Sequence, residues 1–325
     1  MYEMVVVCVQ MCYIDLVEDK SRGGSFMSYY VNPRDFIHEN DSKALNALKA
    51  IPGFEQLTKA FMKVFSERSL KILNMSSKVR LSEEQCPRIY NLLVPICQKF
   101  DIPVPELYLE LDRMPNAYTY GDTTTFITVT SGLLELMTDE EIQAVLAHEV
   151  GHIVCHHVLY QTMGRMVLNG AATLLGLGPL VSTALSVAFA YWMRCSEFSA
   201  DRAAAVFCDG PERVVNVMLR LAGGTSEVAS EIDVKLFMEQ AEDYSDYVDD
   251  SNWNKFLEAL TLMDATHPFL AVRAAAISQW CNQTAFQGIS SGSNLSVLEG
   301  SCPRCGAEVE SDWAFCRKCG APLKN

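Results

Sequence analysis

Apolar residues recur at helical spacing along residues 42–75 of the 325-residue chain. Because positions three or four apart fall on one face of a helix, this pattern predicts amphipathic helices packed on a core. Pro52 and Gly53 interrupt the spacing, so we expect a break between helices there. A further helix is expected over residues 82–100. The apolar positions in the first stretch are Leu45, Leu48, Ile51, Phe54, Leu57, Phe61, Val64 and Phe65.

The pattern changes to that of strands beyond residue 105. Polar and apolar residues alternate from Glu106 to Leu111, and residues 123–130 are rich in β-branched side chains. Gly121 and Asp122 are suited to a turn between these two segments. The chain is therefore expected to be α+β and mainly helical, with a small antiparallel sheet.

A long helix is predicted to begin at Thr138. Glu141 follows three residues later, which is the signature of a capping box, and Asp139 and Glu140 suit the positive end of a helix. The helix should continue through His148 and the residues after it.

Residues 166–193 contain no charged side chain, which leaves two readings open. The segment exceeds the roughly 20 apolar residues that span a membrane. However, Gly176, Gly178 and Pro179 interrupt it, so each half suits a buried helical hairpin better. Contact with a membrane or with an oligomer partner is the alternative.

Net charge and cysteine usage exclude some classes of function for this chain. The formal net charge is −14, which argues against wrapping of nucleic acid by a basic surface. Of twelve cysteines, eight are spread singly and read as small buried apolar residues. The N-terminus lacks the basic region and cleavage site of a signal peptide. We therefore expect a cytoplasmic protein in a reducing compartment, with membrane association as the alternative.

The remaining cysteines form two CxxC pairs near the end of the chain, and each pair precedes a glycine. Four thiolates close a zinc coordination shell, so this Zn²⁺ is expected to be structural and to fold a small zinc ribbon. A redox-active CxxC is the weaker alternative, because no βαβ pattern surrounds either pair. The ribbon is expected to recruit a protein partner, with nucleic acid as the alternative. The four residues are Cys302, Cys305, Cys316 and Cys319.

The strongest chemical signal is an HExxH pattern formed by His148, Glu149 and His152. Residues i and i+4 of a helix lie on one face, so the two imidazoles can reach a single Zn²⁺. Glu149 can lean over a metal-activated water and serve as general base. The pattern predicts a zinc-dependent peptide hydrolase.

The third zinc ligand must come from a separate element. His156 would lie about 12 Å along a continuous helix from His148. Cys155 and Val158 stand where the extended metzincin motif needs glycine and histidine. We therefore expect His156 and His157 to be solvent-facing or core-edge residues without a site role.

Glu197 is the best candidate for the missing ligand. It lies four residues before Asp201, so both carboxylates should project from one helical face. Two histidines and one glutamate leave the fourth zinc position open, as a catalytic site requires. Asp201 could then accept the free ring N–H of a liganding histidine. A helix-terminal acid pair without a metal is the alternative reading.

These blocks resemble the HtpX and CAAX-prenyl-protease family of gluzincin zinc metalloendopeptidases. The matching residues are the HExxH segment 147–152, the segment 197–202, Pro115-Asn116-Ala117 and His267-Pro268 with Arg273. The family has both soluble and membrane-bound members, and the resemblance covers about residues 32–280. It therefore implies a gluzincin metalloprotease domain acting in protein quality control or processing.

The resemblance also implies roles for particular residues. Glu197 would be the third ligand of the catalytic zinc, with Asp201 supporting the site behind it. Asn116 and Ala117 would lie beside an edge strand to which the substrate peptide adds. His267 would help to stabilise the oxyanion, and Arg273 would brace the region.

We therefore divide the chain into four parts. They are an N-terminal extension at 1–31 without expected order, a metalloprotease domain at 32–281, a linker at 282–300 and a zinc ribbon at 301–325. Two Zn²⁺ ions are expected, one catalytic and one structural. The rival readings are a peptide-binding adaptor without catalysis and an integral membrane protease.

Overall fold

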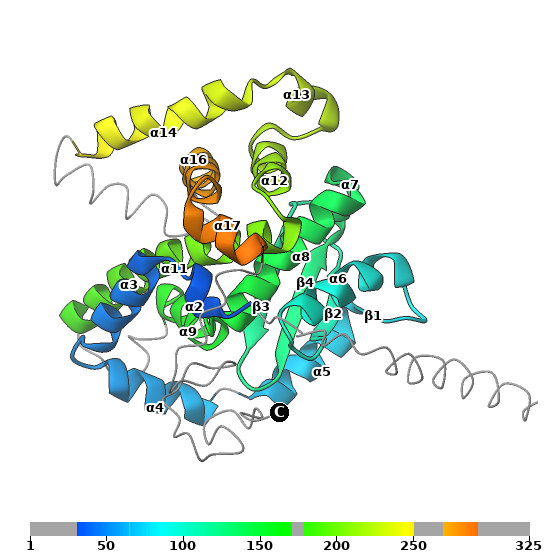
Figure 1. Ribbon diagram of the computed structural model, residues 1–325. Helices are drawn as coiled ribbons and strands as arrows, with labels where there is room; N and C mark the ends of the chain where they lie inside the picture. Colours follow the sequence, from blue (N-terminus) through cyan, green and yellow to red (C-terminus); the bar gives the residue numbers. More distant parts are fainter. Residues whose placement is uncertain (1–30, 65, 171–178, 250–268, 292–325) are drawn as a thin grey trace, which may run out of the picture.

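Helices surround one small sheet in the computed structural model, which describes residues 31–64, 66–170, 179–249 and 269–291 (Figure 1). The mainly helical α+β fold expected from the sequence is confirmed. The helices are α2 (Pro33–Phe36), α3 (Glu39–Lys49), α4 (Phe54–Val64), α5 (Glu67–Ser77), α6 (Pro87–Lys99), α7 (Ser131–Leu136), α8 (Asp139–Val154), α9 (Val158–Leu168), α11 (Pro179–Cys208), α12 (Glu212–Gly223), α13 (Ser226–Glu231), α14 (Val234–Asp249), α16 (Leu270–Cys281) and α17 (Thr284–Ser290). The strands are β1 (Val79–Leu81), β2 (Glu106–Glu110), β3 (Ala117–Gly121) and β4 (Thr125–Thr130).

The sheet is mixed, whereas the sequence predicted a purely antiparallel one. Its order is β1-β2-β4-β3, and β2 pairs with β4 in parallel, with Tyr108 opposite Thr128. The prediction was wrong because it overlooked β3. The turn at Gly121 joins β3 to β4 instead of joining the two predicted strands. Gly121 has a φ of 128°, and a Cβ there would lie 2.1 Å from the carbonyl oxygen of Thr124.

The first predicted helical stretch forms three helices, α3, α4 and α5, with the expected break before Phe54. The helix predicted over residues 82–100 is shorter and begins at Pro87. Proline is favoured in the first turn of a helix because its missing N–H has no partner there anyway. The predicted capping box is present at α8, where Thr138 and Glu141 satisfy each other's backbone N–H groups.

Helix α8 packs directly against α11 at the centre of the molecule (Figure 1). Gly151 permits this close approach. A Cβ there would lie 2.8 Å from Cβ of Ala203 and 3.0 Å from Cα of Ala200. The absence of a side chain at Gly151 therefore sets the distance between the two helices that carry the metal-binding candidates.

The hydrophobic segment 166–193 is split between α9 and α11, and its residues 171–178 lie outside the described ranges. Its described residues contribute to a core cluster together with α3 and α4, which favours the helical hairpin. No helix among the described residues is long and apolar enough to cross a bilayer. The cluster comprises Ala44, Leu48, Phe54, Leu57, Phe61, Met163, Val167, Leu185, Phe189, Trp192 and Cys195.

Several predictions fall outside the described residues. These are the order of the extension up to residue 30, the role of His267, the linker beyond residue 291 and the four ribbon cysteines.

Replacing Gly151 with alanine should force α8 and α11 apart. The added methyl group would overlap Ala203, and overpacking of this kind costs about 1–3 kcal/mol. We expect the free energy of unfolding, measured by urea titration, to fall by that amount. An unchanged midpoint and slope would show that the helices can separate without strain.

Candidate metal centre

Three ligand-type side chains meet between α8 and α11. The candidate atoms of His148, His152 and Glu197 all lie within 4.8 Å of one another. Nε2 of His148 is 3.4 Å from Oε2 of Glu197, and Nε2 of His152 is 3.4 Å from Oε1 of the same carboxylate. Ligand atoms about 2.1 Å from a tetrahedral zinc are about 3.4 Å apart, so the donor set and its spacing fit Zn²⁺.

The sequence explains why these atoms meet. His148 and His152 are one turn apart on α8, and Glu197 faces them from α11 across the close contact at Gly151. All three side chains are buried, with exposed fractions of 8%, 2% and 4%. Their predicted convergence from two distant stretches is therefore present in the structure.

Asp201 lies one turn beyond Glu197 and contacts His148. Its Oδ1 is 3.0 Å from Nδ1 of the imidazole, in the position expected for a carboxylate that fixes the ring tautomer. Burial lowers the pKa of His148, but hydrogen bonds to Asp201 and Glu197 outweigh it and raise that pKa to about 10. The two carboxylates thus give the imidazole a strongly negative environment.

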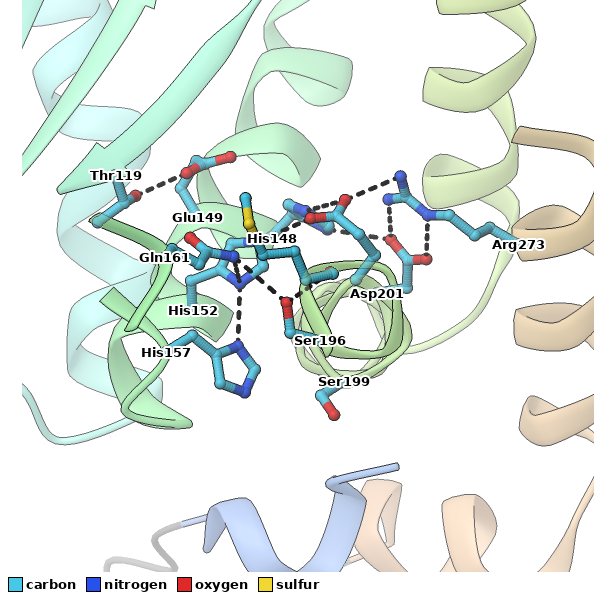
Figure 2. Close-up of polar contacts among 12 residues, drawn as sticks. Thr119, His148, Glu149, His152, His157, Gln161, Ser196, Ser199, Asp201 and Arg273 are labelled. Atoms are coloured by element: carbon cyan, nitrogen blue, oxygen red, sulfur yellow. Dashed lines mark hydrogen bonds and ion pairs between the residues drawn. The ribbon is translucent and has the colours of Figure 1, made fainter. Parts of the chain in front are cut away.

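Arg273 of α16 balances this negative charge. Its Nε and Nη2 donate to Asp201 at 2.7 and 2.6 Å (Figure 2). Its Nη1 lies 2.9 Å from Oε2 of Glu197. Burial opposes ionisation of Asp201, yet the adjacent guanidinium lowers its pKa overall. Arg273 therefore contacts both acids, and the bracing role that the resemblance implies stays a prediction.

Glu149 points toward β3 instead of solvent. Its Oε2 accepts a hydrogen bond of 2.6 Å from Oγ1 of Thr119, and its side chain is 1% exposed (Figure 2). Thr119 was not among the expected site residues, because the strand in which it lies was not predicted. The hydrogen bond fixes one oxygen of the carboxylate next to the metal candidates.

Ala117 begins β3, an edge strand of the described sheet, and Asn116 immediately precedes it. Together with His148 and Glu149 they line a cavity of about 40 Å³ whose other walls are mostly apolar side chains. The two residues assigned to substrate binding by resemblance are therefore next to the candidate catalytic residues.

The prediction that His156 and His157 are solvent-facing or core-edge residues holds for His156, which is exposed, but is wrong for His157. His157 is buried, and its Nδ1 lies 3.0 Å from Nδ1 of His152. The prediction assumed a continuous helix, but α8 ends at Val154 and His156 adopts a left-handed backbone conformation with a φ of 59°. His157 and its partner Asp41 were thus missed.

Removing Arg273 should destabilise the zinc-free protein. Arg273→Leu would leave the carboxylates of Asp201 and Glu197 buried without their guanidinium partner. We expect this to lower the free energy of unfolding by about 3–5 kcal/mol. The free energy of unfolding in the presence of a chelator measures this. Arg273→Lys keeps the charge but not the forked geometry and should lose less. Equal stability of the leucine variant and wild type would contradict the bracing role.

Comparison with known proteins finds matches to two family models. Residues 83–281 match the model of peptidase family M48, and residues 301–323 match that of a zinc-ribbon domain. The plastoglobule-localized metallopeptidase 48 of Arabidopsis thaliana chloroplasts is 32% identical over 262 residues, which cover 80% of this chain and 76% of that protein. No solved structure matches the chain.

Relatives named protease HtpX homologs are more distant. The one from Methanosarcina acetivorans is 26% identical over 179 residues, or 46% of this chain, and the one from Sulfurovum is 30% identical over 155 residues, or 41%. The matched part spans only 60% and 56% of the length of these two relatives. The terminal zinc ribbon expected from the sequence is confirmed by its family match. With its HExxH helix and the matched span of residues 83–281, the chain belongs to peptidase family M48.

Proposed function

We propose that the protein is a zinc-dependent metalloendopeptidase that hydrolyses peptide bonds in protein substrates. The observation that carries the proposal is the convergence of His148, His152 and Glu197 within 4.8 Å. Zinc held by this set would supply Lewis-acid chemistry, which activates water and polarises a carbonyl group. A non-catalytic zinc site would not need a carboxylate such as Glu149 beside it.

Glu149 serves as the general base in this proposal. Thr119 donates a hydrogen bond to Oε2, whereas Oε1 has no hydrogen-bond partner among the described residues. Oε1 can therefore take a proton from the attacking water. The same oxygen then delivers that proton to the leaving amine. Burial of the carboxylate keeps bulk water from competing for this proton. His267 is proposed, from the resemblance alone, to stabilise the oxyanion.

The substrate peptide is proposed to bind along β3. This strand pairs only with β4 in the described sheet, so its other edge can accept an extended peptide by backbone hydrogen bonds. Ala117 begins the strand and Asn116 precedes it, and both line the same cavity as Glu149 and would position the scissile bond. Recognition through the backbone suits an enzyme of protein quality control or processing, because it demands few particular side chains.

The terminal ribbon is proposed to hold a structural zinc and to recruit a protein partner. A closed shell of four thiolates leaves no position for substrate. We further propose a cytoplasmic location, with membrane association through 166–193 as the alternative. The free cysteines of the described residues and the net charge of −14 support it.

Glu149→Gln should abolish proteolysis without removing the metal. The amide cannot accept the proton, so we expect casein cleavage to fall by about 10²–10⁴-fold while the zinc content stays at the wild-type level. Equal cleavage rates for wild type and variant would rule out this role. Absence of cleavage by the zinc-loaded wild type would favour the peptide-binding adaptor.

Metal analysis should find about two zinc ions per chain, each with its own ligands. Glu197→Ala is expected to lose the catalytic ion and keep the ribbon ion, and Cys316→Ser is expected to do the reverse. Plasma emission spectrometry on the dialysed proteins measures both. Retention of both ions in either variant would contradict the assignment of that ligand.

A further inference from the structure

A chain of buried polar contacts connects α3 to the metal candidates. Oδ2 of Asp41 lies 2.8 Å from Nε2 of His157, and Nδ1 of the same ring lies 3.0 Å from Nδ1 of His152. Figure 2 shows the ring of His157 pointing at His152 from the side away from Glu149. Asp41 and His157 are each 1% exposed, so water does not replace either contact. The two imidazoles of the zinc site are thus supported differently: His148 contacts a carboxylate directly, and His152 reaches one through a second imidazole.

Asp41 is held rigidly as a hydrogen-bond acceptor. Its Oδ2 also accepts from Oγ of Ser199 at 2.6 Å, and its Oδ1 accepts from Nε1 of Trp192 at 3.0 Å. Burial opposes ionisation of this carboxyl group, but the hydrogen bonds from His157, Ser199 and Trp192 lower its pKa overall. An ionised carboxylate has no proton to donate, so the nitrogen of His157 that faces it must carry one.

This proton position determines the tautomer of His152. When Nε2 of neutral His157 carries the hydrogen, its Nδ1 has a lone pair and can only accept. Nδ1 of His152 must then donate, which leaves the lone pair of that ring on Nε2. This is the nitrogen that lies 3.4 Å from Glu197 in the ligand cluster. The side-chain amide of Gln161 also lies at this Nδ1, with its Nε2 3.1 Å away. An Nδ1–H of His152 requires the flipped amide orientation, in which Oε1 faces the ring and accepts.

We propose that Asp41 and His157 are positioning residues that select the metal-binding tautomer of His152 and so raise the affinity of the catalytic zinc site. The inference rests on the zinc site of the proposed function. It gives α3 a part in metal binding, although Asp41 lies before residue 83, where the match to the family model begins. Docking of α3 on α11 and the affinity for zinc are therefore coupled.

The test is the zinc dissociation constant of the catalytic site in the full chain, measured by chelator competition. The Glu197→Ala protein defines the signal of the ribbon zinc alone. His157→Phe keeps a ring against Trp192 but removes both nitrogens, and Asp41→Asn keeps the shape but removes the charge that fixes the proton. We expect each to raise the dissociation constant by about 10–100-fold, the usual effect of losing a partner behind a metal ligand.

Two comparisons separate this effect from a loss of packing. Leu185→Ala removes apolar volume from the same core cluster and should lower the thermal midpoint without changing the zinc dissociation constant more than about twofold. His157→Asn places an oxygen acceptor near the former Nδ1 position, so it should recover part of the affinity that His157→Phe loses.

The outcomes are distinct. Wild-type affinity in His157→Phe, or an equal loss in Leu185→Ala, would overturn the proposal while leaving the zinc site intact. If wild type binds no more zinc than Glu197→Ala, the catalytic zinc site itself is wrong, and the proposed function falls with it.

Discussion

The structure depends on balancing several ionisable groups that are buried between two helices. Burying an unpaired charge costs several kcal/mol, so each of these groups must have a partner of opposite charge or a hydrogen bond. Arg273 meets this requirement from α16 by contacting Asp201 and Glu197 together. The requirement explains why helices far apart in the sequence converge here: α8 carries the imidazoles, α11 the carboxylates and α16 the cation.

The two side-chain pairs of the candidate metal centre could be predicted from the sequence because each depends on spacing within a single helix. His148 and His152, and likewise Glu197 and Asp201, are four residues apart, and a helix places such residues on one face whatever its surroundings. The capping box at Thr138 was predictable for the same reason, since its partners are three residues apart. Local geometry of this kind requires no knowledge of the fold.

The features that were not predicted from the sequence depend on contacts between segments far apart in the chain. Asp41 and His157 are separated by 116 positions in the chain, and no periodicity signals that they touch. The strand β3 was missed although it is as long as β2, because Gly121 was interpreted as a turn between the two predicted strands and not as the end of a third. That omission also produced the wrong strand direction, since a parallel pair of β2 and β4 needs the chain to cross over between them. Because the strand was not predicted, Thr119 and its hydrogen bond to Glu149 were not predicted either.

The position of Asp41 bears on where the folded unit of this peptidase begins. A fragment trimmed to the family-matched residues 83–281 would retain every proposed ligand of the catalytic zinc and would discard α3. It would also uncover the faces of Trp192 and Phe189 that α3 and α4 bury. We therefore expect the stable folded unit to include α3 and α4, which precede the residues matched by the peptidase family model.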